Sequence, residues 1–347
     1  MKIHTDYNVK PLNTFGVEAQ VSYYVEIEAE EDIATLLRDE FFLHADKHII
    51  GGGSNLLFTA NVNGVAIKYM PNGIRVLSED ESSVQLELDA GVEWDRAVAY
   101  CCERNWWGIE NLSLIPGVAG AAAVQNIGAY GVEIADVLIS VEGYDLVDGE
   151  RRVYTQNECD YSYRHSRFKR AEEIDRFLIT KVRLRLSKKP TPSLSYNGLQ
   201  DLETVGSSLS PNQIRERVIS IRESKLPDPK VLGNAGSYFM NPVIEADKLQ
   251  SLLQEHPDLS YHIQEDGKAK LSAAWLIDRC GYKGYRSGNV GTYEKHALII
   301  VNYGGASGRE VARLAEEIQQ KVWEKYGVKL VPEVKYVGAP TYNYPQD

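Results

Sequence analysis

The segment IPGVAGAAAVQNIGAYG, from Ile115 to Gly131, is built almost wholly from residues whose side chains cannot carry out chemistry. Because glycine and alanine leave backbone N–H and C=O groups approachable, a large, flat, anionic ligand can lie against the main chain here. A nucleotide or dinucleotide cofactor is the natural ligand of such a surface. A tightly packed small-residue helix contact followed by a turn explains the same pattern, so the segment alone leaves both interpretations open.

A second glycine-rich loop stands earlier in the chain, where Gly51-Gly52-Gly53-Ser54-Asn55 follows a predicted strand at residues 48–50. Its backbone amides can form an anion-binding concavity, and Ser54 and Asn55 add short polar groups for a phosphate. Neither G-x-x-x-x-G-K-[ST] nor a G-x-G-x-x-G that opens a long helix is present, so a P-loop and a Rossmann fold are not supported. We expect a cofactor to lie between the two glycine segments.

Length and composition limit the class of protein. A chain of 347 residues favours two or three domains, and 43% hydrophobic with 25% charged residues is typical of a soluble globular protein. No apolar run approaches the ~20 residues of a membrane span. The start, MKIHTD, lacks the apolar core of a signal peptide, so we expect a cytoplasmic protein.

Charge and ligand types exclude further classes. The net charge of −11 opposes binding to nucleic acid, which usually needs a basic surface. The four cysteines form no CxxC pair and are expected to be reduced thiols. His44 and His48 have helical i, i+4 spacing, but no third ligand accompanies them, so we predict no metal site.

Strands and helices alternate without a regular repeat, which indicates mixed α+β domains. The expected strands cover residues 21–27, 48–50, 65–69, 73–77, 84–90, 136–145, 177–186 and 297–301. The expected helices cover residues 30–38, 93–105, 211–223, 273–280 and 308–326, the last with Ser307 as its N-cap. A loop at residues 188–193 precedes a third unit that begins near residue 211.

Three side chains outside the glycine segments are candidates for chemistry, each with a plainer explanation. Arg164 opens a basic cluster that suits a small phosphorylated ligand, or is a solvated loop end. Ser237 follows two glycines on uncrowded backbone without a G-x-S-x-G elbow, and from these residues alone a bend between loop and strand is the preferred explanation. Glu333 lies between apolar neighbours, where a carboxylate can be held in a partly dry cleft or can point at solvent.

Seven motifs occur in order along nearly the whole chain. They are Asn13-Thr14-Phe15, Gly51 to Asn55, Ile115 to Gly131, Tyr161-Ser162-Tyr163-Arg164, Lys225-Leu226-Pro227, Gly233 to Phe239 and Pro332-Glu333-Val334. Together they make the chain resemble the bacterial UDP-N-acetylenolpyruvoylglucosamine reductases, also called UDP-N-acetylmuramate dehydrogenases. Seven collinear motifs are hard to obtain by accident.

The resemblance implies an α+β fold with a two-subdomain FAD-binding part of the vanillyl-alcohol-oxidase (PCMH) type and a C-terminal α+β substrate-binding domain. Residues 1–70, completed by residues 328–347, would form the first FAD-binding subdomain. Residues 71–210 would form the second subdomain, and residues 211–327 the substrate-binding domain. The resemblance also implies non-covalent FAD and NADPH as the electron donor.

The implied reaction reduces the enolpyruvyl ether of UDP-N-acetylglucosamine to UDP-N-acetylmuramate in peptidoglycan precursor synthesis. NADPH first reduces the flavin, and the substrate then takes its place and accepts the hydride. Arg164 and Glu333 fall at positions that polarise the substrate carboxylate, the arginine through paired N–H donors and the glutamate, when protonated, through one hydrogen bond. Ser237 falls at the position of the general acid that protonates the adjacent carbon.

The resemblance also assigns binding residues. Those for the cofactor are Gly51, Gly52, Gly53, Ser54, Asn55, Pro116, Gly117, Gly120, Gln125, Asn126, Gly128, Ala129, Tyr130 and Gly131. Those for the substrate are Tyr196, which matches a loop tyrosine of the type I branch of the family, Lys225 and Asn241. Met240 stands where a basic residue is expected and His296 where a glutamine is expected, so the grip on a ligand is distributed differently here.

Two other classes of function stay open at this stage. A carbohydrate or alcohol oxidase can share the flavin fold, although many such enzymes tether FAD through His or Cys and the glycine segments contain neither. A non-catalytic UDP-sugar binding protein can keep the fold without turnover. We expect a monomer, although no feature of the sequence sets the oligomeric state or decides between NADPH and NADH.

Overall fold

The computed structural model describes residues 1–338, which divide into two compact units. The first unit is made of Met1–Tyr7, Val21–Gly53 and Asn63–Ser224, and the second of Asn8–Gln20, Ser54–Val62 and the chain from residue 225 onward. The division into three domains stays a prediction. Of the segment 328–347 that it assigns to the first subdomain, residues 339–347 lie outside the described part of the chain.

A four-stranded sheet of the first unit delivers the first glycine loop. Its order is β1 (Lys2–Asn8), β2 (Gln20–Ile27), β5 (Val62–Tyr69) and β3 (Lys47–Ile49). Helices α1 (Glu30–Arg38) and α2 (Glu40–His44) connect β2 to β3 and bury Ile33, Leu36 and Phe42. Since β3 runs parallel to β5 and ends at Ile49, residues 51–53 follow the end of an anchored strand.

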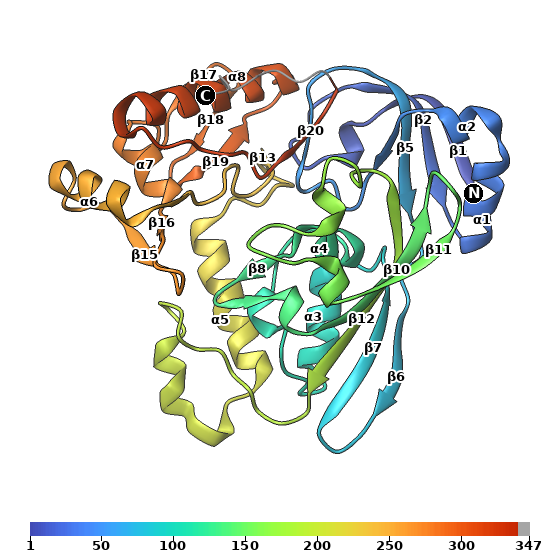
Figure 1. Ribbon diagram of the computed structural model, residues 1–347, viewed down its shortest axis with the longest axis horizontal. Coiled ribbons are helices and arrows are strands. Elements are labelled where there is room, and N and C mark those ends of the chain that lie inside the picture. Colours follow the sequence, from blue (N-terminus) through green and yellow to red (C-terminus); the bar gives the residue numbers. More distant parts are fainter. Residues whose placement is uncertain (339–347) are drawn as a thin grey trace. The chain divides into compact units, whose positions relative to one another are not determined.

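A five-stranded antiparallel sheet forms the rest of the first unit. Its order is β11 (Arg151–Thr155), β10 (Leu138–Asp145), β12 (Phe177–Ser187), β7 (Ser83–Asp89) and β6 (Ile74–Glu79). Alternation along β7 puts fully buried Val84, Leu86 and Leu88 on one face. The helices α3 (Trp94–Cys102) and α4 (Ala119–Gln125) accompany this sheet, and α4 packs directly against β7 and β12 (Figure 1).

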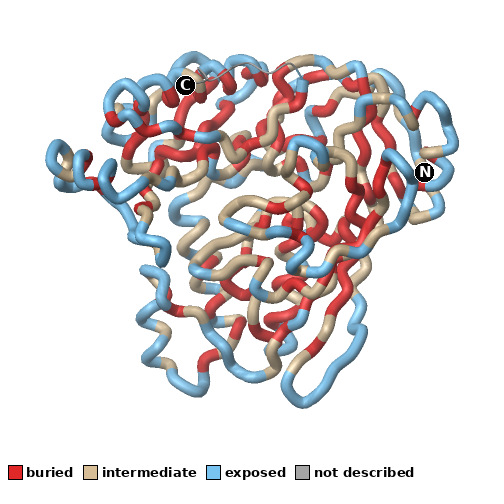
Figure 2. The backbone as a smooth tube through the Cα atoms, in the orientation of Figure 1, coloured by how far each residue is buried: buried red, intermediate tan, exposed pale blue. Residues whose placement is uncertain are grey.

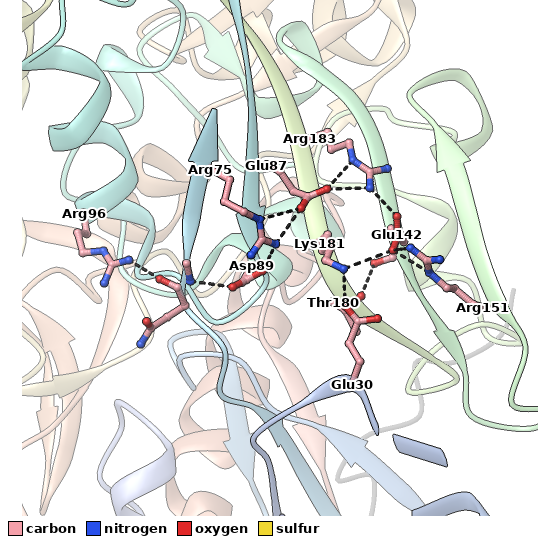
Figure 3. A network of polar contacts seen from close by, with 12 residues as sticks. Glu30, Arg75, Glu87, Asp89, Arg96, Glu142, Arg151, Thr180, Lys181 and Arg183 are labelled. Carbon is pink, nitrogen blue, oxygen red and sulfur yellow. Dashed lines mark hydrogen bonds and ion pairs between the residues drawn. The ribbon is translucent and has the colours of Figure 1, made fainter. Parts of the chain in front are cut away.

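The other face of this sheet carries a row of alternating charges across the strands (Figure 3). Arg183 lies between two buried carboxylates, with nitrogen to oxygen distances of 2.8 Å to Glu87 and 2.6 Å to Glu142. Arg75 reaches Glu87 at 2.8 Å from the adjacent strand, and Arg151 pairs with Glu142 from the other side. Burial alone would raise the pKa of Glu142, but the hydrogen bonds from Arg151 and Arg183 outweigh it and hold this pKa below its ordinary value.

The second unit is built on the sheet β13 (Gly233–Asn234), β19 (His296–Asn302), β18 (Val290–Tyr293) and β17 (Arg286–Ser287). Helices α7 (Ala273–Arg279) and α8 (Gly308–Tyr326) pack against β19. A smaller sheet, β14 (Val243–Ile244), β16 (Ala269–Leu271) and β15 (Tyr261–Ile263), accompanies α6 (Ala246–Glu255). Strand β20 (Lys335–Val337) pairs in parallel with β4 (Leu56–Phe58).

Most predicted elements are confirmed within two or three residues. Helix α8 begins after Ser307, whose hydroxyl accepts from the Glu310 N–H in a capping box, as the sequence predicts. Figure 2 shows that buried residues run along the central strands and that the β6–β7 hairpin ends in an exposed tip. The strands β1 and β11 and the helix α6 were not predicted.

The four cysteines are free thiols. Within residues 1–338, no helix is long and apolar enough to cross a membrane. The same residues contain no group of three or more His, Cys, Asp or Glu side chains arranged to hold a metal ion.

Replacing Glu142 by glutamine is expected to lower the free energy of unfolding by roughly 2–3 kcal/mol, because three neighbouring cations lose a shared buried counter-charge. Guanidinium unfolding followed by circular dichroism measures this change. The matched control is Glu150→Gln, since the Glu150 side chain is 72% exposed and lies 3.5 Å from Arg152. The control should change stability by less than about 0.5 kcal/mol. Equal losses in both variants would contradict a structural role for the network.

Candidate functional site

The two predicted glycine segments meet backbone to backbone in the first unit. A Cβ atom added to Gly52 would lie 2.7 Å from the Gly117 Cα, and one added to Gly51 would lie 2.9 Å from the Ala121 Cβ. Real Cβ atoms do not approach other heavy atoms this closely. The glycines are therefore required where the loop after β3 passes the segment that leads into α4.

The segment at 115–131 is also a small-residue helix contact, so the plainer interpretation of its sequence holds as well. A Cβ on Gly120 would lie 2.8 Å from the Ala90 Cβ, and the Gly120 N–H donates to the Ala90 carbonyl at 2.9 Å. The Ala119 N–H donates to the Val92 carbonyl at 2.8 Å. These two amides of the first turn of α4 are thus used within the protein, and any ligand must take other groups of the segment.

The end of α4 places Arg164. The helix stops at Asn126, whose φ of +43° is left-handed and whose side chain donates to the Ser162 carbonyl at 2.9 Å. Arg164 in turn donates from Nη2 to the Gly128 carbonyl at 2.6 Å. Residues 36 positions apart in sequence are therefore joined, and the guanidinium predicted to act on a substrate is fixed to the segment predicted to hold the cofactor.

Tyr130 links the same segment to the predicted substrate loop. Its carbonyl accepts from the Asn111 side chain at 2.8 Å, and the same Asn111 nitrogen donates to the Ser193 carbonyl at 2.9 Å. The rings of Tyr130 and Tyr196 meet edge to face with centroids 5.0 Å apart. A tyrosine assigned to the cofactor and one assigned to the substrate are thus neighbours in the first unit.

In the second unit, Ser237 and Glu333 lie on two paired backbone segments. Phe239 faces Pro332 in an antiparallel bridge, and the Glu333 N–H donates to the Tyr238 carbonyl at 2.8 Å. Ser237 itself is exposed and follows Gly236, whose φ of +69° favours glycine. The pairing brings the predicted general acid and the predicted glutamate to one edge, although they are 96 positions apart in the sequence numbering.

The end of the first glycine loop is tied to this edge. The Asn55 side chain donates to the Glu333 carbonyl at 3.1 Å, and the Lys335 N–H donates to the Asn55 carbonyl at 3.0 Å. Asn55 therefore fixes the backbone of the glutamate from both sides. The sequence predicts that Asn55 binds the cofactor, and that stays a prediction; the structure adds that Asn55 supports the backbone near Glu333.

The motif at residues 13–15 supports the loop that carries Ser237. The Thr14 hydroxyl donates to the Asn234 carbonyl at 2.6 Å, and the Asn234 N–H returns a hydrogen bond to the Thr14 carbonyl at 3.1 Å. The Asn302 side chain donates to the Phe15 carbonyl at 2.9 Å. A Cβ on Gly233 would lie 2.4 Å from that carbonyl oxygen, so glycine is required there.

The remaining predicted substrate residues lie in the second unit. Asn241 uses its side-chain oxygen to accept from the Ala273 N–H at 3.0 Å, at the start of α7. Lys225 is exposed at the end of α5 (Pro211–Lys225). Nearby stands His296, which was not predicted as a site residue. Burial and the cations Lys225 and Lys283 lower the pKa of the His296 imidazole. Its Nδ1 atom is buried and has no hydrogen-bond partner among residues 1–338.

Sequence reasoning missed two residues around the predicted site, Asn111 and Arg222, and named Lys169 only as a member of the basic cluster that Arg164 opens. Asn111 holds Tyr130 and the loop at Ser193, and Lys169 donates from Nζ to the Gln125 side chain at 3.1 Å. Arg222 stands next to Tyr130 from α5. Asn111 carries no motif spacing, whereas Arg222 leaves a signal, since it falls on the buried face of a helix.

Comparisons with known proteins cover both units. Residues 21–154 match a family described as FAD binding domain, and residues 228–337 match one described as UDP-N-acetylenolpyruvoylglucosamine reductase, C-terminal domain. The crystal structure of UDP-N-acetylenolpyruvylglucosamine reductase from Thermus caldophilus has a TM-score of 0.65 and 23% identity, and the match covers 96% of this chain and 98% of that one. The expected α+β class with an FAD-binding fold is confirmed.

Curated relatives match over nearly the full length. UDP-N-acetylenolpyruvoylglucosamine reductase from Porphyromonas gingivalis is 47% identical over 97% of this chain and 100% of the relative. The protein of the same name from Pseudomonas aeruginosa is 43% identical over 96% of this chain and 98% of the relative. With this identity over both units, the chain belongs to the UDP-N-acetylenolpyruvoylglucosamine reductase family.

Proposed function

We propose that the protein is an FAD-dependent oxidoreductase that uses NADPH to reduce UDP-N-acetylenolpyruvoylglucosamine to UDP-N-acetylmuramate in peptidoglycan synthesis. The observation that carries this proposal is the full-length similarity to reductases of that name, from 39% to 47% identical among those compared. We further propose that it acts in the cytoplasm as a monomer. Non-covalent binding of FAD agrees with glycine segments that contain no His or Cys.

The residues present fit FAD. Where the loop at residues 51–53 passes Gly117, a Cβ would collide with the Gly117 backbone, so glycine lets two segments of bare backbone lie side by side, and such a surface suits a flat dinucleotide. The residues that would hold FAD are Gly51, Gly52, Gly53, Ser54, Asn55, Pro116, Gly117, Gly120, Gln125, Asn126, Gly128, Ala129, Tyr130 and Gly131. When bound, FAD carries hydride from NADPH to the substrate. Within this set, Gly120 and Asn126 would contribute indirectly, by shaping α4, because polar groups of both are used within the protein.

Arg164 and Glu333 would stabilise the negative charge that develops on the substrate carboxylate. A guanidinium offers paired N–H donors to a carboxylate, and Arg164 is held by the Asn126 and Gly128 carbonyls, so little reorganisation is needed. Glu333, when protonated, donates one further hydrogen bond. Its backbone is fixed by Tyr238 and Asn55, which pre-organises the carboxyl group.

Ser237 would supply the proton to the carbon next to the substrate carboxylate. A serine hydroxyl is a weak acid, but a carbanion-like centre is basic enough to take its proton in a shielded site. The residue follows a glycine in the left-handed region and is exposed, so its hydroxyl can approach a carbon without a bulky neighbour. Tyr196, Lys225 and Asn241 would hold the uridine diphosphate, Lys225 by its charge.

The test of the proposed function follows the flavin through both half-reactions in anaerobic stopped flow. Purified full-length protein should contain or take up FAD, NADPH should bleach the flavin absorbance, and UDP-N-acetylenolpyruvoylglucosamine should restore it. NADH in place of NADPH measures donor preference. Colourless protein that takes up no FAD would contradict the proposal. Flavin that is reoxidised by oxygen and never by the enolpyruvyl substrate would favour an oxidase instead.

Replacing Ser237 by alanine should separate the two half-reactions. Flavin reduction by NADPH should stay near the wild-type rate, while reoxidation by substrate should slow by roughly 10²–10⁴-fold, the usual contribution of a general acid. Ser287→Ala is the matched control, because Ser287 is an exposed serine of the same unit on β17. The proton-donor role would be refuted by equal slowing of both half-reactions.

Replacing Gly52 by alanine should weaken FAD binding and stability together. The new Cβ would be 2.7 Å from the Gly117 Cα, so the two segments must separate, at a cost of roughly 1–3 kcal/mol. FAD affinity is measured by fluorescence titration and stability by thermal unfolding. Gly267→Ala is the control, since its φ of +83° adds strain in open, exposed space of the second unit. If both variants retain wild-type affinity for FAD, this contact does not form the cofactor cradle.

A further inference from the structure

Arg222 occupies a position where the pattern of its helix calls for an apolar residue. On α5, Ile214 and Val218 are fully buried, and Arg222 continues their i, i+4 spacing by one more turn. Its Nε atom is out of contact with solvent and has no hydrogen-bond partner among residues 1–338. Burial lowers the pKa of Arg222 from its ordinary value, yet a guanidinium keeps its charge in proteins. The helix therefore holds a cation that is largely removed from solvent at its Nε atom.

The carboxylate of Asp95 does not neutralise this cation. Asp95 contributes to the electrostatic surroundings of Arg222, but both its oxygens are engaged by Arg215, at 2.6 and 2.7 Å. The Leu114 N–H also donates to Asp95 at 2.5 Å. One carboxylate is thus shared between a bidentate arginine, a backbone amide and a second guanidinium. A buried charge left in this state is costly unless a further anion arrives.

The groups around Arg222 belong to the ends of the proposed cofactor segment. The Tyr130 side chain is its neighbour near the end of the segment, and burial raises the pKa of Tyr130 while Arg222 opposes that shift. Asp95 binds the backbone at Leu114, one residue before the segment begins. Arg222 thus stands beside Tyr130 near the end of residues 115–131, and Asp95 in its electrostatic surroundings binds the backbone just before the segment begins, so a ligand lying along that backbone would meet its charge.

We propose that Arg222 is an anion-binding residue for FAD, which gives its guanidinium to a phosphate oxygen or to the electron-rich pyrimidine edge of the bound flavin. This inference rests on the proposed function and adds a residue that neither motif contains. Arginine suits the task because its planar set of donors can serve two acceptor oxygens at once. Tyr130 then orients the guanidinium rather than neutralising it.

This assignment makes opposite predictions for the protein with and without cofactor. In the apoprotein, Arg222→Met removes an uncompensated buried charge and keeps most of the side-chain volume, so the unfolding temperature should stay equal or rise. With FAD, the same change removes a charge-assisted contact. The affinity should then fall by roughly ten- to a hundredfold.

The experiment compares wild type, Arg222→Met, Arg222→Lys and the control Arg217→Met as full-length proteins. Arg217 lies on the same helix, and its exposed guanidinium pairs with Asp201. After flavin removal, thermal unfolding is recorded without FAD, the dissociation constant of FAD by fluorescence quenching, and the midpoint potential of the bound flavin by dye equilibration. Arg222→Lys keeps the positive charge but lacks the planar set of guanidinium donors, so its affinity for FAD should lie between those of wild type and Arg222→Met.

Two results support the inference, and each identifies the atom involved. A lower affinity of Arg222→Met for oxidised FAD indicates that Arg222 binds the phosphates. A lower midpoint potential with unchanged affinity for oxidised FAD indicates that it binds the pyrimidine edge, where reduction adds negative charge. Three results overturn it: wild-type affinity and potential in Arg222→Met, a less stable apoprotein with unchanged FAD binding, or a raised KM for the UDP substrate as the only change. Wild type that takes up no FAD overturns the proposed function as well, whereas the other failures leave that function standing.

Discussion

The close approach of two backbones in the first unit is the constraint on which the candidate site depends. Gly52 passes Gly117 where a single added carbon would be 2.7 Å from the opposite Cα. The position of α4 is set independently, because the segment before it is tied to the strand-to-helix connection at residues 90–94 by the Gly117, Ala119 and Gly120 hydrogen bonds. The loop must therefore adapt to α4, and only glycine allows it to do so.

The end of α4 also determines where Arg164 lies. Because that helix stops at a left-handed Asn126, the chain turns so that the Asn126 and Gly128 carbonyls face Arg164. The basic cluster of the sequence is thereby divided: Arg164 is fixed to the glycine segment, while Arg170 pairs with Asp160 at the exposed surface. In the second unit, Asn55 plays the equivalent part for Glu333. In both units, then, a side chain proposed for chemistry is positioned by residues that were predicted to bind a cofactor.

Local pattern predicted the elements but not their partners. The alternation of Val84, Leu86 and Leu88 is a local property of one strand, and the capping box at Ser307 needs only three residues, so both were recoverable from the sequence. The pairing of Tyr238 with Glu333 joins distant segments with no complementary pattern in either. The charged row on the five-stranded sheet was likewise hidden, because Glu87 and Glu142 look like ordinary solvent-facing residues until their strands are placed side by side.

The charges on the five-stranded sheet are neutralised by neighbours of opposite sign, whereas the charge of Arg222 is not. Acidic residues outnumber basic ones, with a net charge of −11, so a shortage of carboxylates does not explain why Arg222 contacts Tyr130 while its Nε atom has no hydrogen-bond partner among residues 1–338. On the sheet, Glu142 is buried, but the cations that share it are partly exposed, so water lowers the cost of any imbalance on their side. Around Arg222 water is excluded from Nε, and the Asp95 carboxylate in its electrostatic surroundings already holds Arg215 in a bidentate pair. Folding alone gains nothing from a second buried arginine there, and an anion that arrives after folding gives the residue its physical reason.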